Sequence, residues 1–577
     1  MDASFQAVGV SAPLRETAVV SRFRPGALAA YCGVLAAIAL LSLLPMGRLL
    51  VVALAPGGEL DAPAFLERLA TPSVLRATWH TLDTAFFGAV LAMLIGAPAA
   101  VAVAMTDLPG RRSIGFLLLL PLMIAPQVTA LSWLHLFGPS SALLNALGIA
   151  PPPGTPNPIV GRGGIILLYG VQHAPIVFVT LRVGLARIPR DFVEAARAAV
   201  ASTARVLATI ALPLMRPYLL AAAALAFVSG VGNFGIPALL GLPVNYLTLP
   251  TLIYRQMSSF GPGVLPQMAS LSVLISFLAL AGVALQALAT GDAARYSGGI
   301  PARLPLGRFR PLAALLAWGA VFFLLIVPAL ALLSTALVPS FGVRLTLETA
   351  TLSNFAEVLT RQAATMRAFR NSTLLSVTAA VILAMGAIPL ALGLERFGAG
   401  SRRWLQGALE LPYAVPGIVL AIACILLFLR PLPLIGSLYA TAWIILVAYL
   451  MRFAAFAAKP VAAAMRQIPR ELDEAAAAAG AGAFRRMWTI AAPLAAPAAV
   501  AGALLVFMGA FNELTVSALL WSGGNETLGV VLFSLEEAGL AAHAAAIAVS
   551  TIVAAVLILA ILDRFSARLP AGVLPWR

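Results

Sequence analysis

The stretch IPRDFVEAARAAVASTARVLATIALPLMRP, residues 188–217, decides the fold because it returns at residues 468–497 as IPRELDEAAAAAGAGAFRRMWTIAAPLAAP. The two copies share many residues at the same spacing. In the first copy these are Ile188, Pro189, Arg190, Glu194, Ala195, Ala196, Ala198, Ala199, Arg205, Ile210, Pro213 and Pro217. Self-similarity at a fixed period predicts a duplicated architecture, with one copy of the segment in each half.

The duplication continues upstream of the paired segments. Pro98 corresponds to Pro389 at a slightly larger shift, because the first half carries a Pro- and Gly-rich insertion at 138–164 where the second half has only 430–434. The sequence therefore predicts two homologous halves joined by a basic linker. The predicted parts are a tail at 1–26, a first repeat at 27–295, a linker at 296–311 and a second repeat at 312–577.

Composition places both halves in a membrane. Of the 577 residues, 61% are hydrophobic and 10% are charged, and the mean hydropathy is +0.99. Soluble globular proteins are about a quarter charged, so soluble domains of this composition could not cover their surfaces. The same values exclude a disordered chain and a disulfide scaffold. Cys32 and Cys424 lie inside apolar runs without metal-ligand spacing, which predicts that both are buried.

Apolar runs of about 20 residues, the length that crosses a bilayer core, recur along both halves. The predicted spans are 27–54, 82–105, 114–137, 164–186, 212–240, 265–289, 312–338, 372–394, 405–429, 435–457, 493–521 and 541–562. They predict an all-α polytopic membrane protein with about 12 transmembrane helices, arranged as two parallel six-helix repeats.

The basic residues predict the orientation of these spans. With the N-terminus in the cytoplasm, most of the 37 Lys and Arg residues, including Arg452 and Lys459, fall in the inside segments. This bias satisfies the positive-inside rule and places both termini in the cytoplasm. The net charge of +15 is then explained by membrane orientation and is not a nucleic-acid footprint.

Both paired segments fall between the fourth and fifth spans of their halves, on the predicted cytoplasmic side. Glu471 and Asp473 supply the acidic first turn that suits the positive end of a helix dipole, and Gly480 can end that helix. The pattern predicts a short Ala-rich helix, a turn, and then a span entered through two prolines. Such a small-sided helix at the membrane surface fits a groove on a partner.

The paired segments resemble the EAA loop of the membrane subunits of bacterial ABC importers, whose pattern is Glu-Ala-Ala-x3-Gly-x9-Ile-x2-Pro. The second copy fits throughout, and the first copy has Val200 at the glycine position. The resemblance implies a type I ABC importer permease fold, in which each loop helix docks in a cleft of a cytoplasmic ATPase. The implied ATPase-coupling residues are Glu194, Ala195, Ala196, Pro213, Glu474, Ala475, Ala476, Gly480 and Pro493.

The ATPase has to be a separate polypeptide. A P-loop needs a lysine followed by Ser or Thr, and the one lysine of the sequence, Lys459, is followed by Pro460. The resemblance implies two copies of an ABC ATPase that hold ATP and Mg, a periplasmic substrate-binding protein and surrounding membrane lipid. It also implies a non-catalytic subunit of the bacterial inner membrane that binds no cofactor or metal of its own.

The fused double-permease arrangement most closely resembles the ferric-iron importer permeases. The stretch GNFGIPALLG at 232–241, leading to TLPTLIY at 248–254, is similar to that subgroup. The resemblance implies ferric iron as the substrate. Permeases for 2-aminoethylphosphonate, polyamines and thiamine belong to the same superfamily and provide alternatives.

Polar groups inside the predicted spans are candidates for the translocation pathway, because ionisable groups at membrane depth are costly. Glu513, beside Asn512, is predicted to lie mid-span in the eleventh helix, and its repeat counterpart is Asn233 in the fifth. His173 in the fourth span could also face a cavity. The alternative for each is a hydrogen bond or contact that merely fixes helix packing.

Prolines are expected to break the third and ninth spans at equivalent places, as they do in cavity-lining helices, although simple kinks would also explain them. The four residues are Pro121, Pro126, Pro412 and Pro416. Two other function classes stay open. An ion-coupled secondary transporter would need more buried carboxylates, and a membrane enzyme would need a clustered catalytic set, which the sequence does not display.

Overall fold

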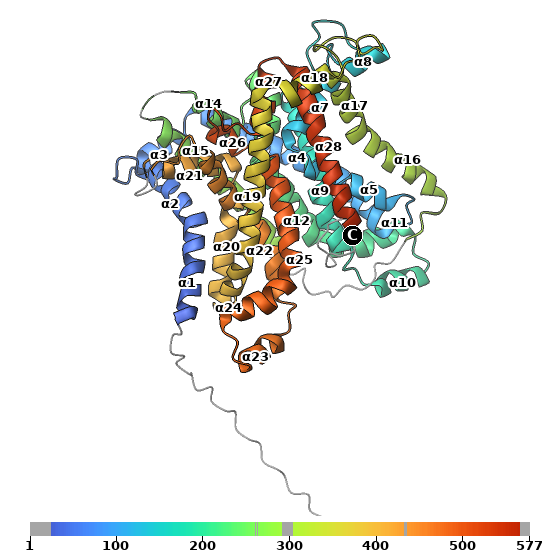
Figure 1. Ribbon diagram of the computed structural model, residues 1–577. Coiled ribbons are helices and arrows are strands. Elements are labelled where there is room, and N and C mark those ends of the chain that lie inside the picture. The colour runs from blue at the N-terminus through green and yellow to red at the C-terminus, as the bar shows by residue number, and fades with distance from the viewer. Residues whose placement is uncertain (1–24, 260, 262, 291–303, 432–435, 566–577) are drawn as a thin grey trace, which may run out of the picture.

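The computed structural model describes residues 25–259, 261, 263–290, 304–431 and 436–565. These residues form a bundle of helices (Figure 1), and within them the sole β-pairing is an isolated bridge between Thr106 and Leu304. Most of the predicted tail at 1–26 and about half of the predicted linker at 296–311 lie outside the described residues.

The part of the first repeat that the structure describes contains fifteen α-helices, which are α1 (Pro25–Ile38), α2 (Leu44–Leu54), α3 (Ala62–Leu69), α4 (Pro72–Met105), α5 (Arg111–Leu117), α6 (Leu120–Met123), α7 (Pro126–Leu136), α8 (Ala142–Leu147), α9 (Arg162–Leu185), α10 (Arg190–Ala198), α11 (Thr203–Val206), α12 (Leu212–Val231), α13 (Gly235–Leu240), α14 (Leu249–Gln256) and α15 (Val264–Thr290).

The second repeat contains thirteen α-helices among its described residues, which are α16 (Arg310–Val321), α17 (Val327–Ala336), α18 (Ser353–Ala356), α19 (Ala363–Leu394), α20 (Ala399–Ala414), α21 (Gly417–Phe428), α22 (Ala442–Met465), α23 (Arg470–Ala478), α24 (Ala483–Arg486), α25 (Ala492–Phe511), α26 (Ser517–Leu520), α27 (Leu528–Glu537) and α28 (Ala541–Phe565).

The predicted membrane architecture is confirmed. Within the described residues, 10 helices are long and apolar enough to cross a membrane, and two sharply bent helix pairs raise the number to 12. The pairs are α5–α6 with α7, bent by 103°, and α20 with α21, bent by 100°. Both bends fall at the predicted prolines, next to Pro126 and Pro416. Pro126 and Pro416 therefore break these spans rather than merely kink them. The prediction is wrong for Pro412, which lies inside α20, and Pro121 lies in the first turn of α6.

The internal duplication is visible in the helix boundaries. From α9 to α12 every helix begins and ends at the residue that corresponds, under the shift between the paired segments, to a boundary in α22 to α25. The parallel six-helix repeat is thus a property of the three-dimensional structure as well as of the sequence.

Prolines also widen the helices in a way that the sequence pattern did not predict. A π-helical turn ends two residues before each of four prolines, Pro45, Pro213, Pro328 and Pro493. Proline lacks an N–H and its ring clashes with the carbonyl four residues earlier, so a wider turn lets the helix continue. The prediction that Pro213 and Pro493 mark the entry to a span is therefore wrong. They lie inside the continuous helices Thr203–Val231 and Ala483–Phe511.

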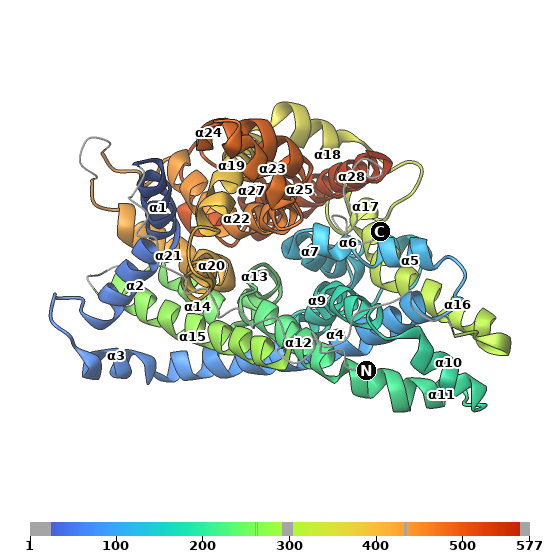
Figure 2. The ribbon, with the colours of Figure 1, turned by 90° about the horizontal axis from the view of Figure 1, so that it is seen from below.

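The two repeats exchange their first helices. α2 packs against α15 of its own repeat and α21 of the other, and α17 packs against α28 of its own repeat and α7 of the other. Figure 2 shows α2 beside α21 at one edge of the molecule and α17 beside α7 further in. The first span of each repeat therefore packs against the bent span of the other repeat.

Two sequence predictions need correction. Cys424 is buried as predicted, but Cys32 is exposed. α1 and the π-helical turn after it pack along one side only, so that their apolar residues Leu35 and Leu40 also face outward. The tenth span begins at Ala442 and not at 435, because Gly436 and Ala440 adopt left-handed backbone conformations that form a turn.

An ion pair fixes the start of α19 to the loop before α27. Glu526 lies 3.4 Å from Arg367 and accepts the backbone N–H of Gly524 at 3.0 Å. Burial raises the pKa of Glu526, but these backbone hydrogen bonds and Arg367 outweigh it, and the pKa lies below its usual range. A lowered folded-state pKa contributes stability above the unfolded-state value of about 4.3, and the contribution is lost as the pH falls through the folded value.

We therefore expect Glu526→Gln to lower the stability of the protein by about 1–3 kcal/mol at pH 7, because a charged hydrogen-bond acceptor is lost. The difference from the wild type should shrink as the pH falls below about 4.3, where the wild-type carboxylate also becomes protonated. Thermal unfolding of both proteins in detergent at pH 7 and pH 4 measures it. A difference that stays constant between the two pH values contradicts the expectation.

Candidate coupling and translocation site

The paired segments form two short surface helices, α10 and α23, at the same end of the molecule. In Figure 1 both lie toward the lower side, away from α8 and α27 at the top. Each begins after a proline, Pro189 or Pro469, whose fixed φ suits a helix start, and each has an acidic first turn. The predicted Ala-rich helix and turn are therefore present in both repeats.

The predicted coupling residues differ in exposure. Glu194, Glu474, Ala195 and Ala475 are exposed, and Ala196 and Ala476 are half-buried on the inner side of their helices. Glu194 pairs with Arg190 within α10, whereas in the described part of the chain Glu474 forms no ion pair. Each helix thus presents a carboxylate beside a methyl-sized side chain, a surface that a partner can approach closely.

Both helices end in the same way. The backbone N–H of Ala201 donates to the carbonyl of Ala196, and that of Ala481 donates to Ala476, which is the Schellman arrangement. It requires a left-handed residue in between, and Gly480 with φ 79° fits without strain. In the first repeat the exposed Val200 adopts φ 58° at this position. A β-branched residue there is strained.

Val200→Gly is expected to stabilise the first loop by about 1 kcal/mol, because glycine adopts the left-handed conformation without a steric cost. Hydrogen exchange of the α10 amides, measured by mass spectrometry in detergent, should slow. The matched control is Gly480→Val in the second repeat, for which exchange should accelerate in α23. Equal exchange in wild type and both variants would show that the residue at this position is neutral.

The two helices are attached to their repeats by different chemistry. Val193 and Val206 of the first repeat are buried in one apolar cluster. Their counterparts in the second repeat are Asp473 and Arg486, which form an ion pair at 2.8 Å. Apolar burial holds α10 and charge pairing holds α23, although both hold the loop to the start of the following long helix.

The candidate pathway residues lie where these long helices end. α12 ends at Val231, and the side-chain oxygen of Asn233 accepts the N–H of Ile236 at 3.1 Å. α25 ends at Phe511, and Glu513 accepts the N–H of Val516 at 3.0 Å. The two equivalent side chains therefore make the same local cap, in which each accepts the backbone N–H of the residue three positions later. The prediction that Glu513 is mid-span is wrong, because this cap stops the helix before it.

Each helix end touches the bent span of the other repeat. The carbonyl of Asn512 accepts a hydrogen bond from Gln127 at the start of α7, at 3.2 Å. Gly232, its counterpart, faces Pro416, which lies 3.4 Å from where a Cβ would be. The helix breaks and the bends therefore meet at the junction between the repeats. Gln127 was missed by the sequence reasoning, although its position just after the helix-starting Pro126 was a signal.

An arginine inside the bundle was also misplaced. Arg452 was assigned to an inside segment, but it lies in the middle of α22, where its Nε is 3.6 Å from a carboxylate oxygen of Glu513. Its counterpart in the first repeat is Gln172, whose amide donates to the carbonyl of Pro121 at 2.6 Å. The alignment of the repeats could have predicted this position, because Arg452 aligns with Gln172, which lies in the middle of a predicted span.

His173 is not brought together with these residues by any described contact. It is buried in α9, its ring lies 5.4 Å from that of Tyr169, and its Nδ1 has no hydrogen-bond partner. Its surroundings are those of a packed side chain within the first repeat.

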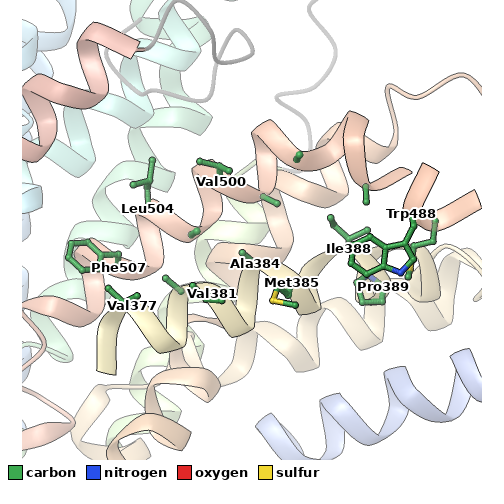
Figure 3. A pocket seen from close by; sticks show the side chains of 16 residues that line it. Val377, Val381, Ala384, Met385, Ile388, Pro389, Trp488, Val500, Leu504 and Phe507 are labelled. Carbon is green, nitrogen blue, oxygen red and sulfur yellow. The ribbon is translucent and has the colours of Figure 1, made fainter. Parts of the chain in front are cut away.

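A groove between α19 and α25 lies apart from these polar residues. Its volume is about 540 Å³, and every side chain that lines it is apolar. Figure 3 shows Trp488 and Pro389 at one end and Val377 and Phe507 at the other. In the first repeat α15 packs along α12, whereas α28 packs against α17 and α27.

Comparison with known proteins assigns both repeats to one family. The sequence matches the family described as "Binding-protein-dependent transport system inner membrane component" over residues 86–291 and again over 387–573, which together exceed half of the chain. The two matches fall in the two repeats.

Individual relatives cover either both repeats or one. The chain is 27% identical over 506 residues to a probable ABC transporter permease protein, y4fN, of Sinorhizobium fredii, which covers 85% of this chain and 87% of that protein. It is 26% identical over 220 residues to the putative 2-aminoethylphosphonate transport system permease protein PhnV of Salmonella paratyphi A, which covers 38% and 81%. It is 27% identical over 168 residues to the Fe(3+)-transport system permease protein FbpB 2 of Haemophilus influenzae, which covers 29% and 33%.

Proposed function

Because the chain belongs to the family of inner-membrane components of binding-protein-dependent transport systems, we propose that it forms the translocation pathway of an ABC importer and couples it to a separate ATPase through α10 and α23. The observation that carries the proposal is the pair of exposed Ala-rich helices at equivalent places in the two repeats. Two copies of one ATPase subunit, each with ATP and Mg, would dock there, one on each helix.

The continuous helices give the loops a path to the junction between the repeats. α10 is followed by the helix Thr203–Val231, and α23 by Ala483–Phe511, and each ends at a polar break that touches the opposite repeat. Movement of a docked loop would therefore displace Gly232 or Asn512, which contact the bends of the opposite repeat. A π-turn interrupts each of these long helices just before Pro213 or Pro493, between the loop and the break.

The orientation follows from the proposed partners. The end with α10 and α23 faces the cytoplasm together with both termini, and the opposite end, which includes α8, receives a periplasmic substrate-binding protein. The chain then needs no nucleotide site, cofactor or resident metal of its own.

For the substrate, the relatives support three candidates at similar identity, ferric iron, 2-aminoethylphosphonate and molybdenum. Ferric iron is the substrate implied by the fused double arrangement. The phosphonate is favoured by a specific observation, the arginine at the junction between the repeats. Polyamine and thiamine have no such support.

The test is reconstitution of the full chain with the ATPase that co-purifies with it and the binding protein encoded beside it. We expect ATP-dependent accumulation of substrate in liposomes, and none when ATP is replaced by a non-hydrolysable analogue. Accumulation driven by a proton or sodium gradient without any ATPase would instead support the secondary-transporter alternative.

A further inference from the structure

The second repeat holds a buried ion pair that the first repeat lacks. Arg452 and Glu513 lie 3.6 Å apart, and their side chains are 16% and 10% exposed. At the same positions the first repeat has Gln172 and Asn233, both uncharged and both hydrogen-bonded to backbone. The fold of one repeat therefore forms without charge at these positions, and the pair is not required for the architecture.

The guanidinium of Arg452 is incompletely satisfied. Its Nε and Nη1 are buried and have no hydrogen-bond partner. Nη1 lies beside Gly417, 2.9 Å from where a Cβ would be, at the first residue of α21 after the bend. A buried donor without a partner costs about 1–3 kcal/mol, so its retention calls for a compensating role.

The carboxylate of Glu513, in contrast, is held without Arg452. One of its oxygens accepts the hydroxyl of Thr515 and the backbone N–H of Val516. Arg452 can therefore leave Glu513 for another anion without stripping that carboxylate of its hydrogen bonds. In this pair Arg452 is the cation, and its counter-ion Glu513 is held in place by hydrogen bonds from Thr515 and Val516.

The pair also lies at the junction between the repeats. Glu513 follows Asn512, whose carbonyl accepts a hydrogen bond from Gln127 of the first repeat. A Cβ at Gly529 would lie 3.2 Å from the Glu513 carbonyl and 3.3 Å from the Gln127 amide. Arg452 is therefore one ion-pair contact away from the residues that join the two repeats.

We infer that Arg452 binds the anionic group of the transported solute, so that the substrate belongs to the oxyanions: phosphonate, phosphate, carboxylate or a metal oxyanion. The inference rests on the proposed function and deepens it by naming the substrate class. A planar guanidinium with free N–H groups matches two oxygens of such an anion, and Glu513 neutralises the arginine while no substrate is present.

The repeat supplies the discriminating experiment. Arg452→Gln, Glu513→Asn and the double variant give the second repeat the residues of the first. Each is reconstituted as the complete transporter, and ATP-dependent uptake of radiolabelled 2-aminoethylphosphonate, phosphate, molybdate and citrate is measured beside ⁵⁵Fe(III). The control is Arg367→Gln, which removes an ion-paired arginine at the start of α19. Thermal unfolding of each complex in detergent reports whether the variant folds.

The wild type should accumulate at least one of the oxyanions. Arg452→Gln should lower that uptake about tenfold or more, which corresponds to the loss of one charge-assisted contact. The double variant should unfold at the wild-type temperature and yet remain as impaired as Arg452→Gln, whereas Arg367→Gln should stay within about twofold of the wild type.

Recovery of uptake in the double variant would overturn the inference. It would show that Arg452 only balances the charge of Glu513 and does not bind the substrate. Uptake of ⁵⁵Fe(III) with no uptake of any oxyanion would also overturn it, and would leave the proposed importer function standing. A chain that recruits no ATPase would overturn both.

Discussion

Glu474→Arg is expected to abolish recruitment of the ATPase to the second repeat and to reduce ATP-driven uptake at least tenfold. The side chain is exposed on α23, and in the described residues it has no internal ion pair, so its carboxylate is available to a basic partner. Reversing one charge of a buried interfacial pair costs about 2–5 kcal/mol, which is enough to lose a complex of ordinary affinity. Co-purification of the ATPase with the tagged chain measures recruitment.

Two matched variants sharpen this prediction. Glu194→Arg changes the equivalent residue of the first repeat and should impair uptake as well, because both loops are needed. Glu348→Arg changes an exposed glutamate in the loop between α17 and α18, remote from α10 and α23, and should leave recruitment unchanged. Loss of the ATPase in Glu348→Arg, or co-purification of as much ATPase with both loop variants as with the wild type, would contradict the assignment of α10 and α23 as the docking helices.

Gly96→Ala is expected to destabilise the first repeat by about 1–3 kcal/mol, and Gly96→Leu by more. The glycine lies where α4 crosses α9, and a Cβ there would approach the carbonyl oxygen of Ala174 to 2.6 Å and the Cβ of Val177 to 2.8 Å. Small residues at such crossings let membrane helices pack backbone to backbone. A backbone carbonyl cannot rotate away as a side chain can, so the helices must separate.

The control is Gly386→Ala in α19, the corresponding helix of the second repeat. Nothing lies within 4 Å of a Cβ at that position. Alanine is the better helix former by about 1 kcal/mol, so this variant should be as stable as the wild type or more so. The temperature at which the monodisperse protein is lost in detergent compares the variants. Equal losses at both glycines would contradict the packing argument.

The course of the backbone could be predicted from the sequence because it depends on local quantities. Apolar length fixes the spans, and the shared residues of the paired segments fix the repeat. Pro126 and Pro416 mark the bends because a proline cannot donate the hydrogen bond that would continue a helix. Hydropathy failed to predict where a helix ends when a side chain accepts a backbone N–H that would otherwise bond within the helix. Asn233 and Glu513 cap the residues that follow them and stop helices that hydropathy alone would extend.

The charged centre could not be predicted for a different reason. A count of basic residues places every arginine in a loop, and it cannot recognise a counter-ion that lies far along the chain. Arg452 is tolerated inside the bundle because Glu513, which follows α25, lies beside it where α25 packs against α22. Likewise, the contact of Gln127 with Asn512 joins residues of different repeats and depends on how the two pack.

The most direct test of the account is photo-crosslinking from the loop helices in native membranes. A benzophenone amino acid at Ala198 of α10 or at Ala478 of α23, both exposed, should capture a P-loop ATPase identifiable by mass spectrometry. The same probe at the fully exposed Leu347, in the loop between α17 and α18, should capture none. The account predicts ATPase adducts from both helices. Adducts from Leu347 with none from α10 or α23 would contradict it.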